Sequence, residues 1–111
     1  MTENQQVEHT PDGHHVLIGG RRWRATDPEV PEGVRDRLTH HLMAARRALA
    51  RLTDDPDAER AARARVRLAK TGLGERGTPW WEQTLPERRR RWEHSLRALD
   101  DADRPPRPAD G

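Results

Sequence analysis

The 111-residue chain contains no cysteine, no phenylalanine and no tyrosine, and it has no long apolar run. Without cysteine there is no disulfide framework, no thiolate zinc site and no cysteine nucleophile. No segment approaches the roughly 18 consecutive apolar residues of a membrane-spanning helix. The acidic, polar N-terminus also lacks the cationic start and apolar stretch of a secretory signal. We therefore expect a cytoplasmic protein that does not contact a membrane.

Motifs for catalysis and cofactor binding are lacking as well. The only serine, Ser95, has just its neighbour His94 as a nearby base, and adjacent side chains on a helix diverge. The six histidines include no pair at i,i+4 spacing and no His-Glu-x-x-His motif. Gly72 and Gly74 lack the strand-before-helix context of a dinucleotide site. We expect no enzymatic activity, no cofactor, no metal ion and no small-molecule substrate.

The composition predicts one small domain with a thin core, because only 32% of the residues are hydrophobic while 36% are charged. A domain this small and polar buries a small share of its surface. We therefore expect an elongated fold, or one completed by another protein or by a second copy of the chain.

Positive charge is concentrated in the middle of the chain, although the formal net charge is only +2. The segment 1–13 holds three acidic residues and no Lys or Arg, and the segment 100–111 holds four acidic residues and two arginines. Residues 14–99 are left with a charge of about +7. All basic residues but Lys70 are arginine, a bias that either a selected basic surface or a GC-rich coding sequence would produce.

The pattern of turns and apolar residues predicts a mostly helical α+β fold with a β-hairpin over residues 14–26. The turn is Gly19-Gly20, because glycine permits the positive φ angles of a two-residue turn. In that register Val16 faces Trp23, and the side bearing both residues is expected to rest on helices, with Trp23 pointing inward. Residues 1–13 and the Pro/Asp tail 100–111 are expected to be disordered.

Three helices are predicted to follow, at residues 31–53, 56–71 and 85–99. The first has a leucine-rich stripe at spacings of three and four, and the second repeats it with small residues, so we expect a close antiparallel helical hairpin. The third opens with a capping box formed by Thr84 and Glu87. The folded part is thus a single domain over residues 14–99.

The densest basic patch is the third-helix run Arg88, Arg89, Arg90 and Arg91. Guanidinium groups pair well with phosphate or carboxylate, so the run is a candidate partner-binding site. The alternative is a solvated surface with some arginines paired to nearby acids. Successive helical positions lie about 100° apart, so no single groove uses all four.

Two further groups are candidate partner-binding residues. His15, Arg22 and Arg24 occupy alternate positions on one face of the predicted hairpin, where they would contact a partner or protect a strand edge by charge. Neighbours in an extended connector cannot both face inward, so one of Trp80 and Trp81 is expected to pack on the helices. The other would anchor a partner or pack under the third helix.

Four segments form a specific pattern: Gly-Arg-Arg-Trp-Arg-Ala-Thr-Asp-Pro at 20–28, Leu-Met-Ala-Ala-Arg-Arg-Ala at 42–48, Ala-Arg-Ala-Arg-Val at 62–66, and Leu-Gly-Glu-Arg-Gly-Thr-Pro-Trp-Trp-Glu at 73–82. Over roughly residues 14–99 the pattern resembles a group of small uncharacterised actinobacterial proteins, often labelled biopolymer transporter Tol. The resemblance implies membership of that group and supplies no activity or functional residue.

By elimination, the sequence favours a non-catalytic binding or adaptor module for another protein or for a second copy of itself. The alternative is a nucleic-acid-associated protein that uses Arg22, Arg24 and the arginine run. The two differ in salt response, because phosphate contacts release counterions and weaken steeply as salt rises.

Overall fold

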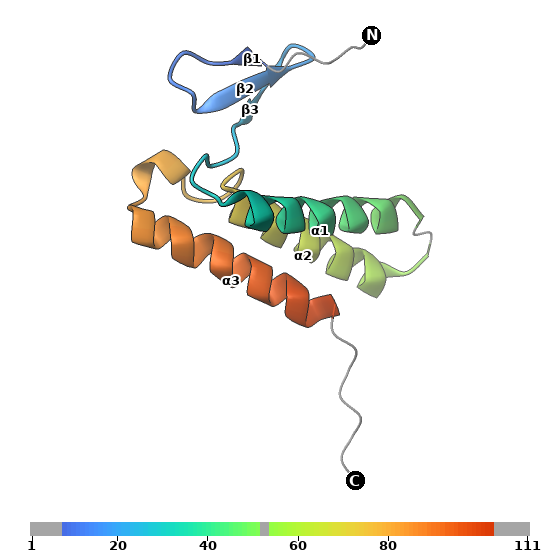
Figure 1. Ribbon diagram of the computed structural model, residues 1–111. Coiled ribbons are helices and arrows are strands. Elements are labelled where there is room, and N and C mark those ends of the chain that lie inside the picture. Colours follow the sequence, from blue (N-terminus) through green and yellow to red (C-terminus); the bar gives the residue numbers. More distant parts are fainter. Residues whose placement is uncertain (1–7, 52–53, 104–111) are drawn as a thin grey trace.

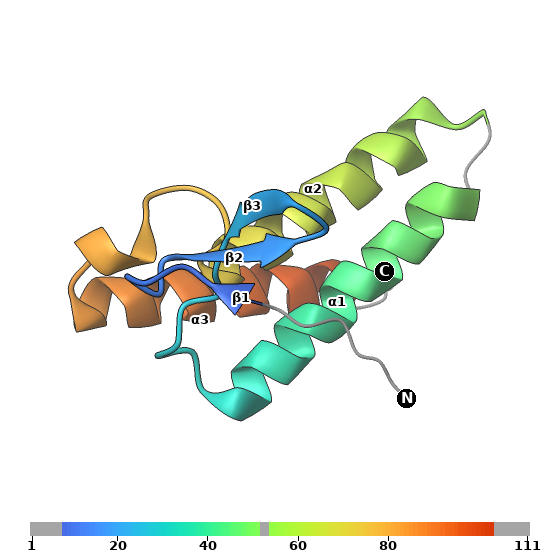
Figure 2. The same ribbon diagram turned by 90° about the horizontal axis from the view of Figure 1, so that it is seen from above.

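The computed structural model describes residues 8–51 and 54–103, which form a small antiparallel sheet standing above a layer of helices (Figure 1). The elements in chain order are β1 (Glu8–His9), β2 (His15–Ile18), β3 (Arg21–Arg24), α1 (Glu32–Arg51), α2 (Pro56–Leu73), the 3-10 helix η1 (Trp80–Glu82) and α3 (Leu85–Asp103). Seen from above, the sheet lies over the C-terminal part of α2 (Figure 2). The predicted mostly helical α+β fold is confirmed.

The β2–β3 hairpin has the predicted register, in which Val16 pairs with Trp23 and Ile18 pairs with Arg21. Gly19 and Gly20 form its turn with φ angles of +57° and +80°. Residues that have a Cβ atom rarely adopt these backbone angles, so the two glycines fix the position of the turn. The register follows from the turn.

The expectation of a disordered N-terminal segment is wrong for residues 8–13. Strand β1 pairs with β2 through Glu8 opposite Leu17, so the sheet has a third strand. The connecting turn is held by Asp12, whose carboxylate accepts from the Thr10 hydroxyl at 2.7 Å and from the His14 N–H at 3.0 Å. These short-range side-chain bonds order a segment that has no hydrophobic period. The other part of this prediction concerns residues 1–7, which lie outside the described residues.

Local capping sets the helix ends. Asp55 begins α2 by accepting the N–H of Ala58 at 3.1 Å, and Gly74, at φ +84°, ends it after Leu73, two residues beyond the predicted end. The predicted capping box opens α3: the Thr84 N–H donates to Glu87 Oε1 at 2.9 Å, and the Glu87 N–H donates to Thr84 Oγ1 at 3.3 Å. The predicted end of the first helix at 52–53 lies outside the described residues.

Helix α3 runs to Asp103 and therefore enters the segment expected to be a disordered tail. Two of its acidic residues are bound to the other helices. Asp100 pairs with Arg37 and with His41 Nε2, the latter at 3.0 Å, while Asp103 pairs with Arg65 and lies 3.3 Å from His41 Nδ1. These ion pairs stabilise the last turn of α3. The sequence did not indicate them, because the partners lie on α1 and α2, far away along the chain. Residues 104–111 lie outside the described part of the chain.

The core lies between the three long helices. Its buried members are Val30, Leu38, Leu42, Ala69, Leu73, Trp92, Leu96 and Leu99. The closest approach is between α2 and α3 at Gly72, where a Cβ would lie 2.8 Å from the Cβ of Ser95 and 3.1 Å from Leu38. Small residues therefore bring α2 close to α3 as well as to α1.

Candidate functional site

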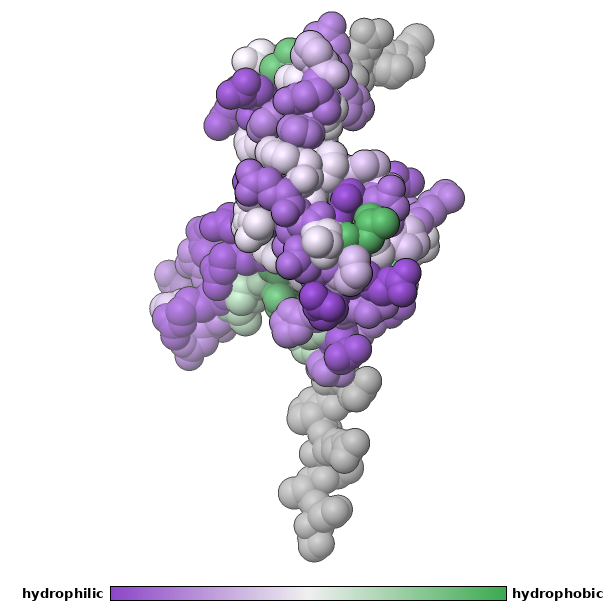
Figure 3. Space-filling model, turned by 90° about the vertical axis from the view of Figure 1, so that its left-hand side faces the viewer, coloured by the Kyte–Doolittle hydropathy of each residue, from purple (hydrophilic) through white to green (hydrophobic). Residues whose placement is uncertain are grey.

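A cleft separates the sheet from α1 and α2. Its upper wall is one face of the hairpin, formed by Val16, Ile18 and Trp23, which we call the cleft face. The cleft has a volume of about 740 Å³, within the range of about 300–1,000 Å³ typical of ligand sites. In the space-filling view a narrow waist joins the sheet to the helical body (Figure 3). The predicted orientation of this face toward the helices is confirmed.

The expected burial of this face is wrong. Ile18 remains 42% exposed and Trp23 remains 41% exposed, because the sheet stands off the helices instead of lying flat on them. Leu17, on the other face of β2, is 36% exposed. Three of the five large hydrophobic residues that are exposed in the described ranges thus lie on one hairpin, while Met43 and Leu85 lie on separate helices.

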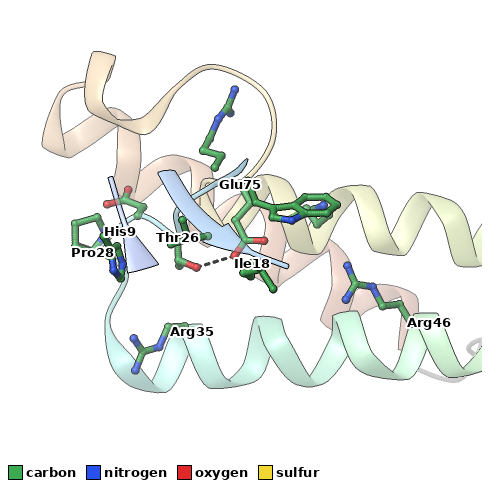
Figure 4. A pocket seen from close by; sticks show the side chains of 12 residues that line it. His9, Ile18, Thr26, Pro28, Arg35, Arg46 and Glu75 are labelled. Carbon is green, nitrogen blue, oxygen red and sulfur yellow. Dashed lines mark hydrogen bonds between the residues drawn. The ribbon is translucent and has the colours of Figure 1, made fainter. Parts of the chain in front are cut away.

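The lower wall of the cleft carries cations. Arg35 and Arg46 extend from α1 (Figure 4), and Lys70 extends from α2. None of the three forms an ion pair with any residue of the described ranges. Glu75 also lines the cleft, but one of its oxygens accepts the Thr26 hydroxyl at 2.6 Å. The cleft therefore combines an apolar wall with a basic wall.

Two cations lie within cation–π distance of the Trp23 ring. The guanidinium carbon of Arg21 lies 4.6 Å from the ring centroid, and Lys70 Nζ lies 5.7 Å from it. Each contact is a cation–π interaction, worth about 0.5–1 kcal/mol at an exposed site. The ring is thereby fixed in position while much of its surface stays accessible.

Beneath the cleft lies a buried ion cluster centred on Asp27. Its carboxylate accepts from Arg88 Nη2 at 2.5 Å, from Arg88 Nε at 3.0 Å and from Arg91 Nη2 at 2.6 Å. The Glu29 N–H adds a bond at 2.9 Å, and the Asp27 N–H donates to the Leu73 carbonyl at 2.9 Å. The cluster fastens the segment after β3 to the end of α2 and to α3.

The charges in this cluster support one another. Burial by itself raises the pKa of Asp27, but the hydrogen bonds from Arg88 and Arg91 outweigh it and hold that pKa below its ordinary value. The same bond to Asp27 raises the pKa of Arg88. The carboxylate side chain is fully buried, and those of Arg88 and Arg91 are 13% and 7% exposed. The cluster is internal and offers no free group to a ligand.

This cluster removes two residues, Arg88 and Arg91, from the predicted partner-binding run on the third helix. Arg88 and Arg91 point into the protein toward Asp27, while Arg89 and Arg90 are exposed. The sequence could not reveal the pairing, because Asp27 lies 61 and 64 residues from its two partners along the chain. Half of the run therefore has a structural role and is unavailable to a partner.

The tryptophan pair holds the sheet to the helices. Trp80 is buried, and its Nε1–H donates to the Ala25 carbonyl at 2.9 Å. The prediction that Trp80 binds a partner is therefore wrong. Trp81 is half-buried, and the His14 ring stacks on it with centroids 3.9 Å apart and planes 5° apart. One tryptophan packs inward as expected, and the other is covered on one face by His14, which directly precedes β2.

The group predicted on the outer hairpin face is only partly available. Arg24 donates to the Gly77 carbonyl at 2.7 Å and lies over the Trp81 ring at 5.8 Å. His15 is half-buried and contacts the same ring edgewise at 5.6 Å. Arg22 alone of the three is exposed and lacks a side-chain partner among the described residues. These residues do not form one patch.

Residues 8–51 and 54–103 contain no group of three or more His, Asp or Glu side chains placed to hold a metal ion. Within the same ranges, no helix has the length and apolar character needed to cross a membrane.

Comparison with protein-family models, curated proteins and solved structures finds no match. The resemblance drawn from the sequence therefore stays a prediction, and the function must be inferred from the residues of this chain. The sequence analysis did not single out the basic wall formed by Arg35, Arg46 and Lys70, because these residues lie on two helices and face one cleft only in the tertiary structure. The sequence did indicate the apolar wall of the cleft, because it placed Trp23 on the same face as Val16 and Ile18. It predicted that Trp23 is buried, whereas the residue is 41% exposed.

Proposed function

We propose that this chain is a non-catalytic protein-binding or adaptor module of the cytoplasm, and that its contact surface is the cleft face with the cations below it. One observation carries the proposal. Ile18 and Trp23 remain more than two-fifths exposed on a hairpin that overhangs cations without carboxylate partners among the described residues. Exposed apolar groups gathered on one element are characteristic of interaction surfaces.

The residue types fit protein recognition. Tryptophan and arginine are the residues most enriched at binding hot spots, where a few anchors supply most of the affinity. Trp23 is already held in place by Arg21 and Lys70, so little conformational entropy is lost when a partner covers it.

Nucleic-acid binding is the less favoured alternative because the arginines that the sequence suggested for it, on β3 and α3, do not converge. Arg88 and Arg91 are neutralised by Asp27, and Arg24 is bound to Gly77. Arg22 belongs to the sheet above the helical layer, whereas the exposed pair belongs to α3 in that layer (Figure 1). A phosphate backbone needs a continuous basic track, which these arginines do not supply, and the cations that do gather, on the basic wall of the cleft, face an apolar wall.

The test is quantitative affinity capture from native cytoplasm with nuclease present, comparing the wild-type chain with Trp23→Ala. We expect a defined set of proteins to be retained by the wild type and lost from the variant. The matched control is Leu85→Ala, which removes the most exposed large hydrophobic residue of the described ranges, 57% exposed, on α3 and outside the cleft lining. Far-UV circular dichroism verifies that both variants are folded.

Two outcomes contradict the proposal. If the same proteins are retained by Trp23→Ala and by the wild type, the cleft face is not the contact surface. If nucleic acid co-purifies and every captured protein disappears after nuclease treatment, the nucleic-acid alternative is correct instead.

A further inference from the structure

The outer edge of β3 is open to a further strand. The sheet order is β1-β2-β3, so β3 has a neighbour on one side only. The Ala25 N–H donates to the His14 carbonyl at 2.9 Å, and bonded and non-bonded pairs alternate along an antiparallel ladder. Trp23 therefore directs its backbone groups toward β2, while Arg22 and Arg24 direct theirs away from the sheet. Among the described residues, none outside the sheet bonds those outward groups.

We propose that an extended acidic peptide segment of a partner protein adds to β3 as a fourth strand and places an apolar side chain in the cleft beside Trp23. This inference rests on the proposed protein-binding function and specifies the class of partner. Strand addition obtains affinity from main-chain hydrogen bonds and specificity from alternate side chains.

Charge complementarity identifies the occupant as acidic. Three of the four residues of β3 are arginine, and they project to both faces of the strand. On the cleft side the basic wall adds Arg35, Arg46 and Lys70, which have no carboxylate partner among the described residues. A carboxylate opposite an arginine on a neighbouring strand contributes roughly 0.2–1 kcal/mol. An acidic strand therefore finds opposite charges on both of its faces.

The same charges exclude a second copy of β3 as the occupant. Pairing Arg21–Arg24 with itself, in either direction, sets arginine against arginine across the new ladder. Like charges directly opposite on neighbouring strands are destabilising. The basic edge thus disfavours homotypic pairing and selects a partner of opposite charge.

Geometry further indicates that the acidic strand carries a bulky apolar residue. A side chain placed beside Trp23 on the cleft side enters a space of about 740 Å³ whose upper wall is apolar. There it would cover the accessible surface of the Trp23 ring and of Ile18. The expected motif is an extended segment in which an aliphatic or aromatic residue lies between acidic ones.

The experiment selects random peptides displayed on phage against the full chain, and then measures affinity by isothermal titration with the enriched peptide. We expect the enriched peptides to carry a central apolar residue with acidic residues on either side of it. Binding should slow amide hydrogen exchange at Arg22 and Arg24, because their N–H groups acquire partners.

Two variants at Arg22 separate main-chain bonding from charge. Arg22→Ala keeps the outward N–H and should weaken binding about two- to fivefold, as loss of an exposed ion pair does. Arg22→Pro removes the N–H at an outward position that an edge strand tolerates, and should bind about five- to tenfold more weakly than Arg22→Ala. Circular dichroism and the retained hairpin amide signals establish that Arg22→Pro is folded.

Three results overturn strand addition. The first is that the selection enriches basic peptides or no peptide at all. The second is that the Arg22→Pro and Arg22→Ala variants bind the peptide with equal affinity. The third is that DNA or RNA displaces the peptide and the Arg22 and Arg24 amides are not protected. Failure here is distinguishable from failure of the proposed function. Cytoplasmic partners that are lost with Trp23→Ala but bind Arg22→Pro normally would leave the protein-binding function standing without the fourth strand.

Discussion

Replacing Asp27 by alanine tests whether the buried ion cluster holds the sheet-bearing segment to the helices. The substitution leaves Arg88 and Arg91 facing each other with no carboxylate, although their side chains are only 13% and 7% exposed. Removing one partner of a buried pair typically costs about 3–5 kcal/mol, because the remaining charge is desolvated and uncompensated. We expect the free energy of unfolding to fall by about that amount.

The assay is urea denaturation followed by far-UV circular dichroism at neutral pH. A loss of about 3–5 kcal/mol is a large fraction of the roughly 5–15 kcal/mol that stabilises a typical domain. An osmolyte such as sucrose in all samples keeps the variant folded for comparison. Asp27→Asn, which keeps the shape and one acceptor oxygen, provides a milder second measurement.

Two further variants make the result decisive. Asp57→Ala removes an exposed carboxylate paired with Arg60 and should leave stability unchanged within error. Replacing Asp27, Arg88 and Arg91 together by apolar residues should recover much of the loss, because no charge then remains buried. An unfolding free energy for Asp27→Ala within about 1 kcal/mol of the wild type would refute the reasoning.

The remaining predictions concern packing and acid sensitivity. Gly72→Ala should destabilise the fold by about 1–3 kcal/mol through overpacking against α3, where the new Cβ would meet a neighbour at 2.8 Å. Gly33→Ala, with open space around it, should stabilise by about 0.4–1 kcal/mol in the same denaturation assay. Burial raises the pKa of Asp100, but its bonds to a histidine and an arginine of α1 hold that pKa below its ordinary value. Its stabilising contribution is therefore present above the unfolded carboxyl pKa and lost as pH falls through the folded pKa, and Asp100→Asn should flatten that part of the curve of unfolding free energy against pH. Trp80→Ala should cost about 3–5 kcal/mol, whereas Trp23→Ala should cost much less because that ring is 41% exposed; a reversed order of the two thermal unfolding midpoints would contradict the assignment of their roles.

Some elements could be predicted from the sequence because short-range physics decides them. Gly19-Gly20 fixes the hairpin turn and therefore the pairing of Val16 with Trp23. The capping box of Thr84 and Glu87 fixes the start of α3. In each case the interacting groups are a few residues apart, so the chain holds them together whatever the rest of the fold does.

Only the tertiary structure decided which charged and aromatic residues form the candidate site. The sequence shows four consecutive arginines, but the fold assigns Arg88 and Arg91 to Asp27, more than 60 residues away, and leaves their neighbours exposed. The hydrophobic pattern placed Trp23 on the correct face, but its exposure depends on how far η1 and the segment after α2 hold the sheet above the helices. Pairing and burial between distant segments depend on the position of every intervening element, and no local pattern encodes that position. The sequence therefore determined the hairpin, the three long helices and their faces, while the tertiary structure determined which of those faces stayed open to a partner.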